Sequence, residues 1–181
     1  MRDFDKSVAF ALQHETVFAK LHYGDMKFAI SENDASDPGR LTKFGIDQRS
    51  HPDVDIKNLT VEQAIEIYRT CYWNPAQGDI LPYPLNLEHF DSAVNLGLHQ
   101  AIKLLQRACG ANDDGVWGPK TMAAVLNTCK ASGSVATALH TADLRRDFYK
   151  NLADNKASAM KYLKGWLNRL NDLEVMIKNP L

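Results

Sequence analysis

Apolar positions recur at helical spacing over most of the chain. In residues 4–20, Phe4, Val8 and Leu12 fall on one face of a helix, and Glu15 lies toward the end of the segment. This spacing predicts a first helix with one face packed in the core and Glu15 near its C-terminal end.

The next helical pattern begins with a recognisable start signal. Thr60 and Gln63 fit a capping box, and Leu59 and Ala64 are placed as a hydrophobic staple. With the patterns that follow, it predicts a mainly α-helical bundle. The predicted helices cover 59–73, 88–95, 98–109, 119–129, 135–152 and 157–177.

Residues 21–58 break the helical pattern. Glycine and proline punctuate them, and alternating pieces such as Met26–Ile30 are typical of hairpin strands. We therefore predict a small β-hairpin or looped insert after the first helix. A stretch of this length without regular structure in a compact domain is usually functional.

Composition and charge exclude several classes of partner. The chain has 181 residues, a net charge of −1 and a pI of about 6.6, so no electrostatic footprint for nucleic acid is present. No apolar run approaches the roughly 18 residues of a membrane span, and we expect no stable membrane insertion. Charged residues interrupt the N-terminus, which predicts that the protein lacks a signal peptide and is cytoplasmic when made.

The cysteines and histidines do not indicate a metal or disulfide framework. Cys71, Cys109 and Cys129 are odd in number and lie in predicted helices, so we interpret them as buried free thiols in a reducing compartment. The six histidines show no paired metal spacing. We expect no metal and no cofactor.

Glycoside hydrolysis offers a role for the carboxylates. The reaction needs a carboxylic acid to protonate the leaving oxygen, and usually a second carboxylate. Glu15 follows an apolar helix, which suits the acid, while Asp37 is a candidate partner and Thr42 could hold a water. Taken alone, however, Glu15 is typical of a solvated carboxylate at a helix end, and Asp37 of a turn residue before Pro-Gly.

Four groups of residues, in order, form a pattern over nearly the whole chain. They are His14-Glu15 with Asp37 to Ile46; Leu59-Thr60 with Ala64, Tyr68, Tyr72 and Trp73; Phe90-Asp91 with Asn95 and Gly97; and Arg145, Phe148-Tyr149, Gly165-Trp166 and Arg169. Together they resemble glycoside hydrolase family 108, which consists of phage-type and bacterial N-acetylmuramidases. The resemblance implies a lysozyme-like α+β fold.

The resemblance implies the catalytic roles residue by residue. The family's catalytic glutamate falls on Glu15, and the accompanying Asp and Thr of phage lysozymes fall on Asp37 and Thr42. The spacer is longer than usual, since 37 − 15 = 22 positions separate the two carboxylates. Glu32 or Asp34 in this insert is an alternative second carboxylate. Thr16-Val17-Phe18 and Arg40 also depart from the family's glycines.

A second resemblance covers residues 102–121. Leu104-Leu105-Gln106, Gly110, Asp114-Gly115, Trp117-Gly118 and Thr121 resemble a helical peptidoglycan-binding motif. Trp117 could stack on a sugar face. The alternative is a purely structural loop that caps and aims the helix starting at Pro119. We place a catalytic core at 1–97, with its insert at 21–58, and a peptidoglycan-binding-like lobe at 98–181.

Three further residues are candidates for substrate binding. Tyr72 and Trp73 lie with Tyr68 at helical spacing, a pattern that is more often core than sugar platform. Asn95 could bond an N-acetyl group, or it could be a satisfied buried amide.

The function implied is hydrolysis of the β-1,4 bond between N-acetylmuramic acid and N-acetylglucosamine in peptidoglycan, by inversion on the analogy of phage lysozymes. A lytic transglycosylase and a non-catalytic wall-binding module are the alternatives. Without a signal peptide, the protein fits an endolysin released through a holin pore. It equally fits an antibacterial effector delivered by a secretion system and countered by an inhibitor or immunity protein. We expect a monomer.

Overall fold

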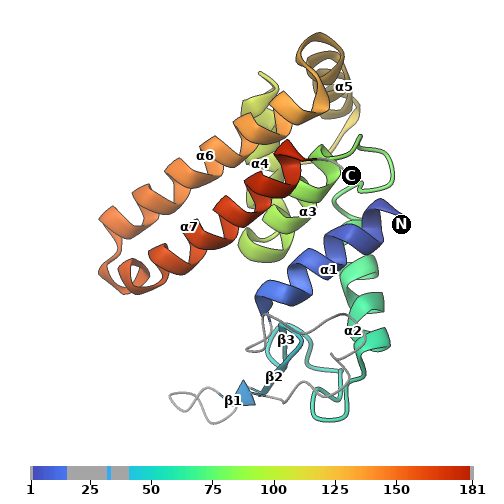
Figure 1. The fold of residues 1–181 in the computed structure, drawn as a ribbon, viewed down its shortest axis with the longest axis vertical. Coiled ribbons are helices and arrows are strands. Elements are labelled where there is room, and N and C mark those ends of the chain that lie inside the picture. Colours follow the sequence, from blue (N-terminus) through green and yellow to red (C-terminus); the bar gives the residue numbers. More distant parts are fainter. Residues whose placement is uncertain (1, 16–31, 34–40, 180–181) are drawn as a thin grey trace. The chain divides into compact units, whose positions relative to one another are not determined.

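The computed structural model describes residues 2–15, 32–33 and 41–179. The chain forms two compact units, Met1–Cys71 and Tyr72–Leu181 (Figure 1). The first contains helix α1 (Asp3–Glu15), strands β1 (Glu32–Asn33), β2 (Leu41–Lys43) and β3 (Ile46–Asp47), and helix α2 (Val61–Tyr68). A π-helical turn, Arg69–Trp73, follows α2.

Helix α1 confirms the predicted apolar stripe. Phe4, Val8 and Leu12 are all buried, and Glu15 is its last residue. The Arg69 guanidinium lies 3.7 Å from the centre of the Phe4 ring and holds the start of α1 against the end of α2. Residues 16–20, predicted to continue the helix, lie outside the described residues.

The predicted β-insert is present as a three-stranded antiparallel sheet in the order β1-β2-β3. Thr42 pairs with Glu32 on one side and with Asp47 on the other. Phe44 and Gly45 connect β2 to β3 and both have positive φ, 54° and 76°. Two successive positive φ values are the mark of a tight hairpin turn whose twist matches that of the strands. Met26–Ile30 lie outside the described residues.

The start of α2 follows its predicted capping box. The Thr60 side chain accepts from the Gln63 backbone N–H, and the Gln63 side chain accepts from the Thr60 backbone N–H. The end of α2 differs from the prediction, because the chain passes into a π turn with one more residue per turn.

This π turn corrects the predicted burial of Cys71. An α-helix would bring Cys71 and Tyr72 onto the buried face of Tyr68, but the wider turn places Trp73, five residues on, in the core. Cys71 is exposed, and its predicted burial is wrong. Cys109 and Cys129 are half-buried, and all three thiols are free. Burial raises the pKa of Cys109 to about 11.

The second unit consists of helices packed around α3. They are α3 (Leu85–Leu96), α4 (Leu98–Ala108), α5 (Pro119–Ser132), α6 (Ser134–Asn155) and α7 (Ala157–Lys178). Every residue from Leu85 to Ala93 is buried, since α4, α6 and α7 all pack on α3. Helices α6 and α7 run antiparallel, side by side (Figure 1). None of the helices in the described part of the chain is long and apolar enough to cross a membrane.

The two compact units have a different boundary from the one predicted between the catalytic core and the peptidoglycan-binding-like lobe. The boundary between the units falls after Cys71 in the sequence, so α3 belongs with the C-terminal helices on which it packs. The division at 97/98 was inferred from motifs, and it stays a prediction about function.

Candidate functional site

Glu15 sits directly against the hairpin turn of the sheet. A Cβ atom built on Gly45 would lie 2.7 Å from both Cβ and Cγ of Glu15. Real side chains do not approach so closely, so only glycine fits at position 45. The stem of the Glu15 side chain therefore packs on the bare backbone of the turn, at the end of α1.

Tyr68 binds the same turn. Its buried hydroxyl donates a hydrogen bond of 3.0 Å to the backbone carbonyl of Phe44. A Cβ on Gly45 would also lie 2.6 Å from this hydroxyl. Phe44 and Ile46, 3% and 1% exposed, anchor the hairpin in the core on either side of Gly45. The turn thus contacts both Glu15 and Tyr68.

The predicted partners of Glu15 are only partly described. Thr42 is half-buried in the middle of β2, next to the strand position of Asp47. The Asp47 carboxylate accepts from the backbone N–H groups of Arg49 and Ser50, both at 3.0 Å, and so closes the loop after β3. Asp37 and Asp34 lie outside the described residues, and only the backbone of Glu32 is described. The second carboxylate stays a prediction.

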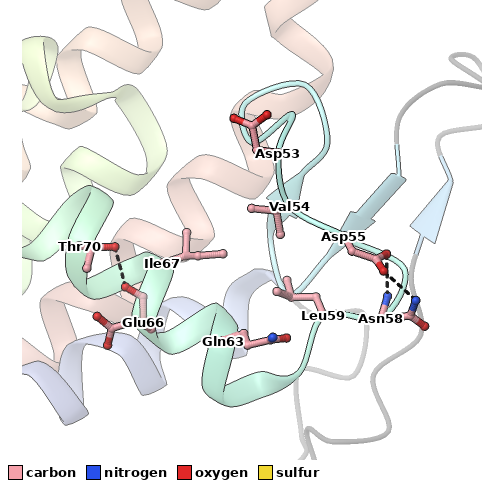
Figure 2. A pocket seen from close by; sticks show the side chains of 9 residues that line it. All are labelled: Asp53, Val54, Asp55, Asn58, Leu59, Gln63, Glu66, Ile67 and Thr70. Atoms are coloured by element: carbon pink, nitrogen blue, oxygen red, sulfur yellow. Dashed lines mark hydrogen bonds between the residues drawn. The ribbon is translucent and has the colours of Figure 1, made fainter.

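A pocket of about 440 Å³ lies elsewhere in the first unit (Figure 2). The loop before α2 and the outer face of α2 line it, and it carries three carboxylates, those of Asp53, Asp55 and Glu66. Asn58 donates to Asp55 at 2.8 Å, and this bond holds the pKa of Asp55 below its usual value. Glu15 does not line this pocket, so the predicted acid and the pocket are separate features.

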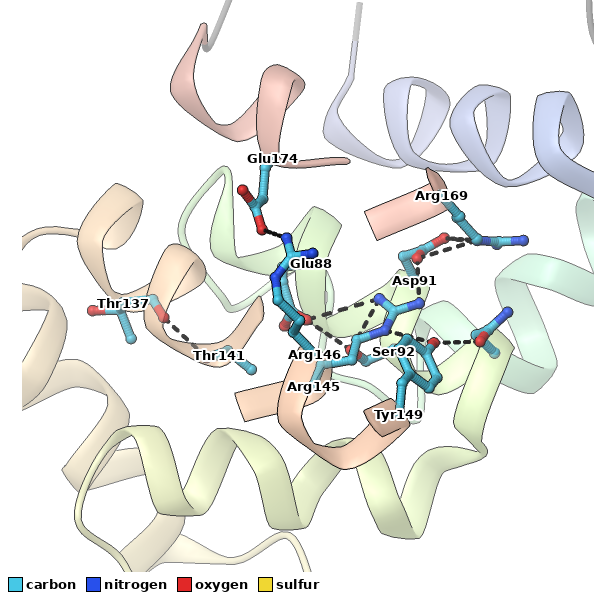
Figure 3. A network of polar contacts seen from close by, with 11 residues as sticks. Glu88, Asp91, Ser92, Thr137, Thr141, Arg145, Arg146, Tyr149, Arg169 and Glu174 are labelled. Atoms are coloured by element: carbon cyan, nitrogen blue, oxygen red, sulfur yellow. Dashed lines mark hydrogen bonds and ion pairs between the residues drawn. The ribbon is translucent and has the colours of Figure 1, made fainter. Parts of the chain in front are cut away.

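In the second unit, charged residues from three helices meet in the core (Figure 3). Asp91 of α3 binds Arg145 of α6 at 2.9 Å and Arg169 of α7 at 2.7 Å, and all three side chains are buried. Burial alone would raise the pKa of Asp91, but Arg169 and Arg145 outweigh it and hold that pKa below its usual value. Asp91 is therefore an ionised carboxylate that ties α3 to both long helices.

Asn95 belongs to the same network. The Tyr149 hydroxyl accepts from Arg145 Nε at 2.9 Å and donates to the Asn95 side-chain oxygen. Asn95 is half-buried and its side-chain oxygen accepts this bond, while its contact with an N-acetyl group stays a prediction. The network consists of residues that carry the family resemblance: Asp91, Asn95, Arg145, Tyr149 and Arg169. In this part of the pattern, the shared residues therefore contact one another and connect helices.

Trp73 does not form a sugar platform. It is 1% exposed, its ring packs edge-on against Phe90, and its indole N–H donates to Asp79 at 2.8 Å. A Cβ on Gly78 would lie only 2.2 Å from the indole ring. The predicted binding role of Trp73 is corrected to a core role, because the π turn directs it inward. Tyr72 is half-buried, and its role stays a prediction.

The loop before α5 is organised by one buried glutamine. The Gln106 side-chain nitrogen lies within hydrogen-bond distance of Asp114, the Val116 carbonyl and Thr121, at 2.8, 3.1 and 2.9 Å. Its oxygen accepts from the Gly115 backbone at 2.9 Å. The Gln, Asp-Gly and Thr of the second motif therefore fasten this loop to α4 and α5, as the structural alternative proposed.

Trp117, the predicted stacking residue of this loop, is half-buried. Its ring centre lies 6.1 Å from that of His89, which is fully buried in α3. Trp117 therefore covers part of the core, and stacking on a sugar stays a prediction for its remaining exposed surface.

Glu88 and His89 give the second unit an opposing pair of buried titratable groups. Burial raises the pKa of Glu88 to about 7, against the lowering effects of Arg145 and Ser92. Burial lowers the pKa of His89 to about 4, and neither ring nitrogen has a hydrogen-bond partner. In the folded state Glu88 is therefore mostly neutral below about pH 7. His89 is mostly neutral above about pH 4.

We expect the two groups to cancel in the stability of the unit between pH 4.5 and 6.5. The contribution of neutral His89 to the free energy of unfolding is complete above its unfolded pKa of 6.5, and it is lost as the pH falls toward 4. The contribution of Glu88 is complete below its unfolded pKa of 4.5 and is lost as the pH rises toward 7. Glu88→Gln removes only the second effect. Its unfolding free energy should therefore rise from pH 4.5 to 6.5, while that of the wild type changes little.

Urea unfolding of the full chain at several pH values, followed by tryptophan fluorescence, measures this difference. All three tryptophans lie in the second unit, so the signal reports on the helices that bury both groups. A Glu88→Gln variant with the same flat profile as the wild type would show that Glu88 does not titrate in this range.

Comparison with known proteins decides the family. Residues 7–97 match the family described as Glycosyl hydrolase 108, and residues 100–171 match a domain described as Predicted Peptidoglycan domain. The chain belongs to the glycosyl hydrolase 108 family. Among solved structures, one titled Structure of Brucella abortus SagA is similar over 97% of this chain and 94% of that one, with 26% identity and a TM-score of 0.75. A comparison with curated proteins found no match.

Family membership defines the chemistry at the level of class. A member of this family with a peptidoglycan domain is a glycosidase that acts on peptidoglycan, and its fold is mainly α and lysozyme-like. Two features of the site escaped sequence reasoning. Tyr68 and Gly45 were noted only as motif residues, and their spacing along the chain gives no sign that they meet at Glu15.

Proposed function

We propose that this glycosyl hydrolase 108 protein is an N-acetylmuramidase. It cleaves the β-1,4 bond between N-acetylmuramic acid and N-acetylglucosamine, and Glu15 is the general acid that protonates the leaving oxygen. The observation that carries the proposal is the close packing of Glu15, the last residue of α1, against the glycine of the hairpin turn. A general acid must be held at a defined position relative to the bond it protonates.

The proposal extends to the second half of the reaction. Asp37 activates the attacking water, with Thr42 helping to hold it, and the reaction inverts the anomeric centre. This outcome corresponds to a separation of about 6.5–9.5 Å between the two carboxyl groups, which leaves room for the water. Thr42 contributes from β2, whose end forms the turn beneath Glu15.

The proposed biological role rests on the chemistry directed at peptidoglycan. We propose that the protein acts as a monomer on the glycan strands of the cell wall and lyses bacteria. It reaches the wall from the cytoplasm through a holin pore or a secretion system. In the second case an inhibitor or immunity protein protects the producing cell.

Product analysis of digested sacculi tests the proposed bond. Mass spectrometry after borohydride reduction should find muropeptides that end in reduced N-acetylmuramic acid, because a muramidase leaves this sugar at the new reducing end. Ends in 1,6-anhydromuramic acid, lighter by one water, would instead identify a lytic transglycosylase. Ends in reduced N-acetylglucosamine would show that the other glycosidic bond is cleaved. Intact sacculi would indicate a wall-binding protein without activity.

A further inference from the structure

The turn beneath Glu15 has an unusual backbone for its sequence. Phe44 has a φ of 54°, in the left-handed region that a bulky side chain rarely adopts. Such a conformation persists only when its surroundings hold it. The Phe44 ring is buried, and the carbonyl of the same residue accepts the hydrogen bond from Tyr68. These two contacts fix the turn on both its side-chain and its backbone groups.

The same turn determines where the Glu15 side chain can lie. With no side chain at Gly45, Cβ and Cγ of Glu15 rest on the turn, and a shift of the turn would move the surface that supports them. The turn therefore supports the stem of the Glu15 side chain, from which the carboxyl group extends.

We propose that Tyr68 is a positioning residue for Glu15. Its hydroxyl holds the Phe44–Gly45 turn in place, and the turn in its left-handed form holds the carboxyl group where it can protonate the glycosidic oxygen. Tyr68 acts through the turn and does not need to touch substrate. The inference rests on the proposed role of Glu15 as the acid.

A positioning role for Tyr68 predicts that its loss lowers kcat and leaves KM unchanged. A small displacement of a catalytic group lowers the rate of the chemical step, and about 1 Å can cost 10²-fold. Because Tyr68 is buried in the first unit and acts on the acid, its loss should spare substrate binding. We expect Tyr68→Phe, which removes only the hydroxyl, to lower kcat by about tenfold to a hundredfold with KM unchanged.

Tyr149→Phe is the matched control. It removes the hydroxyl of another buried tyrosine that is hydrogen-bonded, but in the network of the second unit. We expect it to lower Tm while leaving kcat unchanged at a temperature where the protein is folded. Gly45→Ala is the second variant, since it places a methyl group against both Glu15 and the Tyr68 hydroxyl and so displaces the turn while every polar group is kept. It should also lower kcat at unchanged KM, and circular dichroism checks that each turn variant is folded before its kcat is compared.

The outcomes separate this inference from the proposed function. Loss of kcat in Tyr68→Phe and Gly45→Ala, but not in Tyr149→Phe, supports positioning. The inference is overturned by wild-type kcat in both turn variants, by a change in KM alone, or by an equal loss of kcat in Tyr149→Phe. Glu15→Gln is measured on the same sacculi. If it stays active, the acid is misassigned; if it is inactive while the turn variants are fully active, only the positioning role fails.

Discussion

Glu15→Gln should lower the rate of peptidoglycan hydrolysis by about 10²- to 10⁴-fold, the usual contribution of a general acid. Glutamine has nearly the same shape but cannot donate a proton to the leaving oxygen as a carboxylic acid does. The variant should fold normally, because the contacts of the turn are with Cβ and Cγ of Glu15, which glutamine retains. Release of soluble muropeptides from purified sacculi measures the rate, and circular dichroism checks the fold.

Glu66→Gln is the matched control for this experiment. Glu66 is an exposed carboxylate of the same unit, and it lines the pocket that Glu15 does not reach. We expect this variant to have wild-type activity. The reverse result, with Glu66→Gln inactive and Glu15→Gln active, would move the catalytic site to the pocket beside α2.

The helices could be predicted because their signals are local. The stripe in α1, the capping box of Thr60 and Gln63 and the proline at the start of α5 each depend on residues within a few positions of one another. The hairpin was predicted as a region, since glycine and proline exclude a helix there, but its strand pairing was not.

The errors arise where the structure departs from regular periodicity. The π turn after α2 shifts the buried face by about one residue, which exposes Cys71 and buries Trp73. A sequence pattern based on 3.6 residues per turn cannot register this change. The burial of Trp73 agrees with the core alternative for the aromatic pattern and excludes its candidate role as a sugar platform.

Contacts between residues far apart in the sequence could not be predicted, and the sequence showed these residues only as parts of motifs. Asp91 and Arg169 are 78 positions apart, and Gly45 and Tyr68 are 23 positions apart, since 68 − 45 = 23. The resemblance marked these residues as belonging to a family pattern but could not distinguish a catalytic role from a structural one. The contacts show charge pairing in the second unit and packing of Glu15 on the hairpin turn in the first.

Asp91→Asn should strongly destabilise the second unit. Asp91 is the carboxylate shared by Arg145 and Arg169, and asparagine would leave two buried guanidinium groups without their common anion. Removing one partner of a buried ion pair typically costs about 3–5 kcal/mol. Urea unfolding followed by tryptophan fluorescence measures the loss on the full chain, since Trp73, Trp117 and Trp166 all lie in this unit.

Asp113→Asn is the control, because Asp113 pairs with Arg107 at the surface. Solvent already screens this pair, so its loss should change the free energy of unfolding little. A second comparison separates the ion pairing of Asp91 from its packing. The double variant Asp91→Asn with Arg169→Met removes the anion and also one of the two cations that would otherwise be left unpaired. We expect the double variant to be more stable than the sum of the single changes predicts, because the charges are coupled. If the two changes are simply additive, Asp91 stabilises the helices by its packing and not by its charge.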